Sequence, residues 1–233
     1  MKFLTISDYQ LPVLACICLF FAMSFYWISL TSRSFSKRIK FENEDKILTN
    51  SDSKHVQLGY FETGKLLILV SNILFFFTLL FRWIGDGYFP LSNLYESLIF
   101  LSWAISSIHL FLENKTKSRV IGSISSPILF LLSGFSSLTL PIEMQKALPL
   151  VPSLQSNWLM MHVSMMMVSY ATLILGSLLS ILYLAFLYFN NQNKEVNLIS
   201  GTVSSLSMSK LSLLQTVDIW SYRIIGLGFP FLT

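Results

Sequence analysis

Long apolar runs constrain this chain more than any other feature. Only 12% of its 233 residues are charged and 53% are hydrophobic, whereas a soluble domain carries about 25% charged residues. A helix needs about 20 mainly apolar residues to cross a bilayer. Five runs approach or exceed that length, and a sixth begins near residue 217: 11–30, 66–81, 94–112, 120–140, 158–189 and the incomplete 217–233. We therefore predict an all-α, polytopic transmembrane helix bundle that forms a single integral membrane domain over residues 1–233.

The basic residues lie on alternate connections between the predicted spans. The first, third and fifth connections carry 13 of the 16, namely Arg33, Lys37, Arg38, Lys40, Lys46, Lys54, Lys65, Lys115, Lys117, Arg119, Lys194, Lys210 and Arg223. The remaining three are Lys2, Arg82 and Lys146. Loops rich in Lys and Arg stay on the side of the membrane from which the protein is inserted. We therefore expect the N-terminus and the second and fourth loops on the opposite, far side of the membrane. This topology explains the net charge of +4 without a nucleic-acid partner.

Three connections have compositions that predict irregular structure. Residues 32–64 mix both charge signs and are expected to be solvated, and residues 190–209, rich in Asn and Ser, are expected to form a flexible connector. Residues 141–152 contain three prolines, which should hold the segment extended. The last segment is either an ordinary connector or part of a docking surface on the far membrane face.

His162 is the residue with the clearest chemical potential, because it stands near the start of the longest apolar run. Ionisable groups at a bilayer are costly, so they often have a function, and imidazole is a common ligand of haem iron. Trp158, Met165 and Met166 share its helix face by their spacing. An aromatic ring and thioethers around an imidazole suit a flat apolar cofactor. The alternatives are a histidine that reaches water at the headgroups and a methionine cluster that only packs.

Polar residues at the two ends of the run 94–112 offer further candidates. Asn93 and Glu96 should lie on the same side of the membrane as His162. Ser92 or Asn93 can cap the start of this helix, and Glu96, three or four residues later, can complete a box-like capping pattern. Glu96 is also a candidate polar partner for a bound group. His109, at the opposite end, is expected to reach the membrane surface. The chain contains no nucleotide-binding loop, nucleophile elbow or zinc motif, so nothing indicates a soluble catalytic site.

Two blocks carry a resemblance to a known family. Residues 87–103, GYFPLSNLYESLIFLSW, and residues 150–170, LVPSLQSNWLMMHVSMMMVSY, resemble signature segments of the CcsA (ResC-like) cytochrome c biogenesis proteins. A weaker match is residues 221–233, SYRIIGLGFPFLT. The resemblance implies a membrane subunit of a system II haem-attachment complex, which presents haem b on the lumenal or periplasmic side. The implied partners are a CcsB-type (ResB-like) membrane protein and apocytochrome c.

The resemblance assigns His162 as an axial ligand of haem iron, with Trp158, Met166, Asn93 and Glu96 as the other cofactor-binding candidates. The family's tryptophan-rich WWD segment would follow residue 233, so the second far-side histidine is expected beyond these residues and the chain looks truncated. The subunit would be a component of a synthetase or lyase complex without acid–base catalytic residues of its own. The alternatives are a transport subunit and a structural subunit of an electron-transfer complex that binds no haem. Abundant Phe, Leu, Ile, Ser and Asn fit an AT-rich plastid genome, so we expect a thylakoid membrane, with a bacterial inner membrane as the second location.

Overall fold

The computed structural model describes residues 2–42, 50–116, 119–146, 157–199 and 208–233, and within these ranges it contains helices and no strand. The all-α prediction is therefore confirmed. The helices are α1 (Lys2–Glu42), α2 (Asn50–Asp86), α3 (Leu94–Thr116), α4 (Arg119–Gly134), the π-helix η2 (Phe135–Thr139), α5 (Ile142–Gln145), α6 (Asn157–Ile199) and α7 (Met208–Leu232).

The five complete spans predicted from the apolar runs correspond to five helical segments of the described chain. These segments are long and apolar enough to cross a membrane: Gln10–Thr31, Gly59–Asp86, Leu94–Thr116, Val120–Thr139 and Trp158–Tyr188. The predicted second span was too short, since the apolar helix around it includes polar residues at both ends. The incomplete run 217–233 lies within α7, which already begins at Met208.

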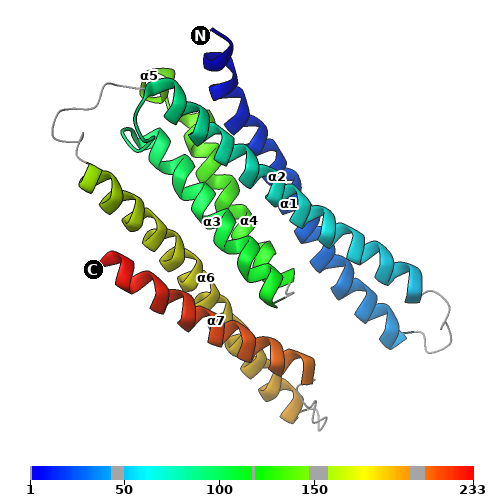
Figure 1. Ribbon diagram of the computed structural model, residues 1–233. Helices are drawn as coiled ribbons and strands as arrows, with labels where there is room; N and C mark the ends of the chain where they lie inside the picture. Colours follow the sequence, from blue (N-terminus) through cyan, green and yellow to red (C-terminus); the bar gives the residue numbers. More distant parts are fainter. Residues whose placement is uncertain (1, 43–49, 117–118, 147–156, 200–207) are drawn as a thin grey trace. The chain divides into compact units, whose positions relative to one another are not determined.

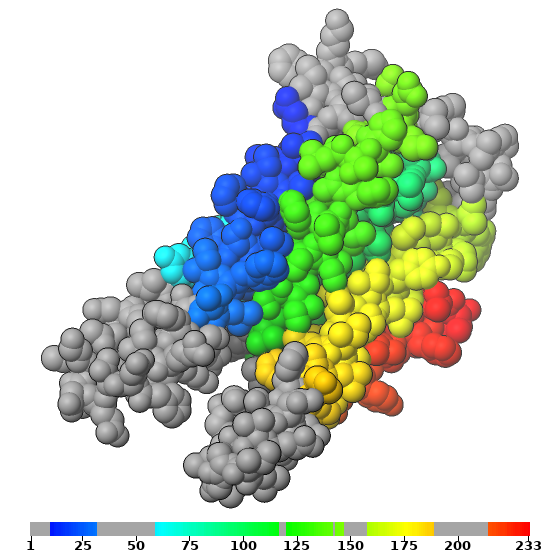
Figure 2. Space-filling model, turned by 180° about the vertical axis from the view of Figure 1, so that it is seen from behind, coloured from blue at the N-terminus to red at the C-terminus, as the bar shows by residue number. Residues whose placement is uncertain are grey.

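The chain divides into two compact units, Met1–Met167 and Val168–Thr233. In the first unit, α1 to α4 run alternately up and down, so that each helix is antiparallel to the next (Figure 1). α1 packs against both α2 and α4, and α3 also packs against both. Figure 2 shows α1, in blue, lying along the green helix α4. The short helix α5 packs against α3, at the end of the bundle where α2 ends and α3 begins; we call this the α2–α3 end.

Close packing of the first unit depends on one buried tyrosine and two glycines. Tyr26 of α1 is fully buried, and its ring lies against Gly64 of α2 and Gly122 of α4. A Cβ at position 64 would lie 3.1 Å from the ring, and one at position 122 would overlap it. The absence of side chains at these two positions therefore allows three helices to converge around the phenol.

The second unit is a tight pair formed by α6 and α7. The Ser169 hydroxyl of α6 donates a 2.6 Å hydrogen bond to the Gly228 carbonyl of α7. Gly176 faces Ile225, and Gly228 faces Thr172 closely enough that a Cβ would collide in either case. Small residues at a helix interface let two backbones approach in this way, as in many membrane proteins.

Two of the connections between the predicted spans are partly helical where the chain is described. The flexible connector expected at 190–209 was therefore wrong for residues 190–199, whereas the expected solvation of residues 32–64 stays a prediction. α1 continues to Glu42 and α2 starts at Asn50; α6 continues to Ile199 and α7 starts at Met208. Residues 32–42 and 190–199 contain neither Pro nor Gly, so nothing in them breaks a helix that has already formed. In the proline-containing segment, Ile142–Gln145 form one helical turn after Pro141, and residues 147–156 lie outside the described chain.

Candidate functional site

The start of α3 is fixed by an N-terminal cap. The Ser92 backbone N–H and hydroxyl both donate to Glu96 Oε2, at 2.9 and 2.8 Å, and the Ser97 N–H donates to the Asn93 carbonyl at 3.0 Å. The Glu96 half of the predicted box-like pattern is present, because the carboxylate accepts the Ser92 backbone N–H just before the helix. It places Glu96 in the first turn, where a carboxylate is also favoured by the partial positive charge of a helix N-terminus.

Arg82 is the residue that the sequence analysis missed. Its side chain is 4% exposed and that of Glu96 is 0% exposed, with 3.0 Å between Arg82 Nη1 and Glu96 Oε1. Arg82 Nη2 donates to the Gln145 carbonyl at 2.8 Å, and the guanidinium lies 4.5 Å from the centre of the Tyr95 ring. We call Arg82, Glu96 and Gln145 the Arg82 clamp. It joins the end of α2, the start of α3 and the turn α5.

The clamp could have been suspected from the sequence. Arg82 and Glu96 flank a short connection between two apolar runs, and opposite charges at the facing ends of antiparallel helices often meet. Arg82 was instead counted as a loop charge. A second link nearby involves Asn93, whose Nδ2 donates to the Lys146 carbonyl at 2.7 Å. Asn93 and Glu96 are thus brought together at the α2–α3 end, and both engage backbone or side-chain partners there.

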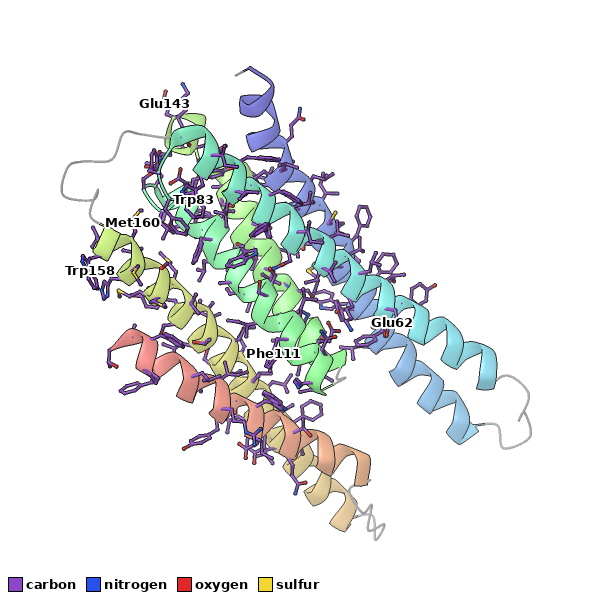
Figure 3. The ribbon with its side chains drawn as sticks, viewed as in Figure 1. Glu62, Trp83, Phe111, Glu143, Trp158 and Met160 are labelled. Carbon is purple, nitrogen blue, oxygen red and sulfur yellow. The ribbon has the colours of Figure 1, made fainter. Side chains whose placement is uncertain are left out.

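An apolar pocket lies beside this end of the bundle. It has a volume of about 160 Å³ and is lined by Phe76, Leu79, Leu80, Trp83, Phe89, Pro90, Phe100 and Trp103. Figure 3 labels Trp83 close to the end of α2. The ring of Trp103 packs against those of Phe76 and Phe100. The pocket has no charged lining residue, so it suits an apolar chain or ring.

His162 stands in the second turn of α6 with its side chain exposed. Trp158, one turn earlier, is 82% exposed (Figure 3), Met165 is also exposed, and Met166 is half-buried. In the described chain, no hydrogen bond or ion pair joins His162 to Asn93 or Glu96. The imidazole nitrogens are therefore accessible to a ligand, among apolar and polarisable side chains. That arrangement fits one axial position of a haem iron; the haem-binding roles of the five candidate residues stay predictions.

A second buried polar group, at the opposite end of α3, contradicts one expectation. His109 was expected to reach the membrane surface, but it is 0% exposed. Its Nδ1 lies 2.8 Å from Ser125 Oγ of α4, and its Nε2 lies 3.3 Å from Glu113 Oε2. The Tyr26 hydroxyl of α1 donates to Glu113 Oε1 at 2.7 Å. We call these four residues the His109 cluster. The side chain turns inward because Ser125, Glu113 and Tyr26 supply polar partners inside the bundle.

Comparison with known proteins identifies the family. The family model described as Cytochrome C assembly protein matches residues 91–233, which is more than half of the chain. The chain belongs to the cytochrome c assembly protein family. The matched part of this family member contains Asn93, Glu96, Trp158, His162 and Met166, whereas Arg82 precedes it.

Curated relatives of this cytochrome c assembly protein carry the name cytochrome c biogenesis protein CcsA, which confirms the resemblance seen in the sequence. The protein of Trieres chinensis is 46% identical over 92% of this chain and 68% of its own length. That of Porphyra purpurea is 49% identical over 75% of this chain and 63% of its own length. The protein of Synechocystis is 44% identical over 65% of this chain and 58% of its own length. The chain thus spans only about six tenths of the length of the curated relatives that it matches. No solved structure matches it.

Proposed function

We propose that this chain is the part of a cytochrome c maturation subunit that offers haem for covalent attachment to apocytochrome c. Membership of the cytochrome c assembly family and the names of the CcsA relatives support this role. So do five helices that are long and apolar enough to cross a membrane. The substrate is haem b, whose vinyl groups supply the thioether chemistry when they meet the cysteine thiols of the apocytochrome.

The observation that carries the proposal is the exposed imidazole of His162 in the second turn of α6. A fully buried histidine such as His109 is poorly placed to ligate iron. His162 instead has an exposed side chain, and Trp158 and Met166 at helical spacing provide an apolar surface for one porphyrin face. Axial ligation by an imidazole holds the iron while the porphyrin edge stays open to another protein.

The side of the membrane follows from the charge pattern. Basic residues concentrate on the first, third and fifth connections, so α6 would begin on the opposite side. We infer that His162 lies near the lumenal face of a thylakoid membrane, in keeping with relatives from plastids and cyanobacteria. A bacterial inner membrane, with His162 facing the periplasm, is the second location. A CcsB-type membrane protein and apocytochrome c are the proposed partners.

Haem titration of the purified chain in detergent tests the ligand assignment. We expect added haem to give a Soret band that His162→Ala weakens and that free imidazole restores, because exogenous imidazole can occupy the vacated axial position. His55→Ala is the matched control, since it removes one of the three histidines without touching the proposed site. An identical Soret band in His162→Ala and the unaltered chain would reject ligation by His162.

A further inference from the structure

The His109 cluster unites three helices around ionisable groups that the proposed function does not use. Side-chain exposure is 0% for His109 and 1% for Glu113, and Tyr26 is 0% exposed. The Tyr26 ring also stands edge-on to the imidazole, with centroids 6.3 Å apart and an interplanar angle of 87°. Because water is excluded, the protons in the cluster can be assigned from the hydrogen-bond partners.

The proton on His109 Nδ1 is fixed by Ser125. A serine hydroxyl has one proton to donate, and we assign that of Ser125 to the Ile121 carbonyl, which lies 2.9 Å away. Ser125 Oγ therefore acts as the acceptor in its 2.8 Å contact with His109 Nδ1. Nδ1 must carry a hydrogen, which leaves Nε2 as the nitrogen that can gain or lose one.

The facing atoms of His109 and Glu113 require a proton between them. Nε2 and Oε2 lie 3.3 Å apart, within ion-pair distance, and neither atom makes a hydrogen bond to any described residue. Without a proton, two acceptors would face each other and a carboxylate charge would be buried with no counter-charge, which is strongly unfavourable. One proton removes both problems. The Tyr26 hydroxyl, which donates to Oε1, favours the ionised carboxylate, so the proton rests on Nε2.

We propose that His109 and Glu113 form a buried binding site for a single exchangeable proton, with Tyr26 and Ser125 holding the two side chains in place. Uptake of a proton from water converts the neutral imidazole beside a carboxylate into an imidazolium–carboxylate pair, and release reverses this step. No other reactant is needed. The cluster lies at the end of α3 that leads into the basic third connection, so the exchange would take place with that side of the membrane.

The described groups around the pair favour the bound proton, because they contribute neutral hydroxyls and one negative charge. α1 contributes the phenol of Tyr26, and α4 contributes the neutral hydroxyl of Ser125. α2 contributes Glu62, whose negative charge acts on Tyr26. The Lys115 ammonium of α3 lies over the Phe111 ring instead. The Arg82 clamp at the other end of α3 differs in kind, because a guanidinium keeps its proton at any accessible pH.

Nitrogen NMR of the histidine rings tests the proposal on the unaltered full chain. With ring-¹⁵N-labelled histidine in detergent micelles, His109 should be protonated on both nitrogens near neutral pH. On raising the pH, Nε2 should lose its proton while Nδ1 keeps its own. Glu113→Gln should leave the ring protonated on Nδ1 alone at neutral pH. The signals of His55 and His162 serve as internal controls, since they should be the same in Glu113→Gln as in the unaltered chain.

Two results would overturn the proposal. A His109 ring that carries its single proton on Nε2 would contradict the assignment made from Ser125. A ring whose protonation is the same in Glu113→Gln as in the unaltered chain would show that the pair shares no proton. The first result is read from the unaltered chain, so it holds even if a variant fails to fold. Because neither measurement involves haem, the outcome is independent of the proposed haem function.

Discussion

Arg82→Met should lower the free energy of unfolding by about 3–5 kcal/mol, the usual effect of removing one partner from a buried ion pair. The pair is 4% and 0% exposed with a 3.0 Å contact, so solvent does little to screen the Glu96 charge that remains. Methionine preserves much of the side-chain volume, which keeps the effect of a cavity small. The variant also loses the hydrogen bond to the Gln145 carbonyl, which leaves that carbonyl without its charged donor.

A double-mutant cycle isolates the contribution of the charge. Glu96→Gln should also destabilise the fold, because it removes the carboxylate charge that faces the buried Arg82 guanidinium at 3.0 Å. The double variant Arg82→Met/Glu96→Gln buries no unpaired charge, so it should be less destabilised than the sum of the single variants by about 1–3 kcal/mol. Glu143→Gln is the control: Glu143 is an exposed residue of α5, and the change should stay within about 0.5 kcal/mol.

Equilibrium unfolding in detergent, followed by tryptophan fluorescence, gives the free energy of unfolding of the unaltered chain, the two single variants, the double variant and the Glu143→Gln control. The reasoning would be refuted if the two single effects simply added in the double variant. It would also be refuted if Arg82→Met matched the Glu143→Gln control, since the guanidinium would then contribute nothing that a methionine lacks.

Two further predictions concern packing and sidedness. Gly122→Ala should destabilise the chain by about 1–3 kcal/mol, because its Cβ would overlap the Tyr26 ring; Gly59→Ala, with no atom near the added Cβ, should be neutral or slightly stabilising in the same unfolding assay. In a background with Cys16 and Cys18 replaced by Ser, His162→Cys should react with a membrane-impermeant maleimide from the lumenal or periplasmic side, and labelling only from the opposite side would reverse the predicted topology.

The spans and the helix cap were predictable because they depend on local pattern. A run of about 20 apolar residues has few alternatives to a membrane helix, and the Ser92–Glu96 cap is encoded within five residues. The exposed position of His162 matches its place near a span end, as does that of Trp158. Its proposed ligand role came from the family resemblance together with the residue type.

The features that the sequence did not predict depend on contacts between residues that are far apart in the chain. Tyr26 and Glu113 are 87 positions apart, so no local pattern predicts a phenol beside His109. Without that partner, an ionisable residue near a span end is expected to reach water. Arg82 was misread for the same reason, because the Gln145 carbonyl that it contacts belongs to a turn 63 positions away. The helical extensions of α1 and α6 were missed because polar composition was taken as a sign of irregular structure.

α3 carries a buried acid–base pair at each end, and the chemistry of the base makes the two pairs different. At the N-terminal end, Glu96 faces a guanidinium that stays charged, so the pair can only hold the helix ends together. At the C-terminal end, Glu113 faces an imidazole, which has a neutral form as well as a charged one. Exchanging the bases should exchange these properties: His109→Arg would make the C-terminal pair insensitive to pH, whereas Arg82→His would make the clamp weaken as pH rises. A pH series of unfolding measurements on both variants would show whether the base alone decides the behaviour.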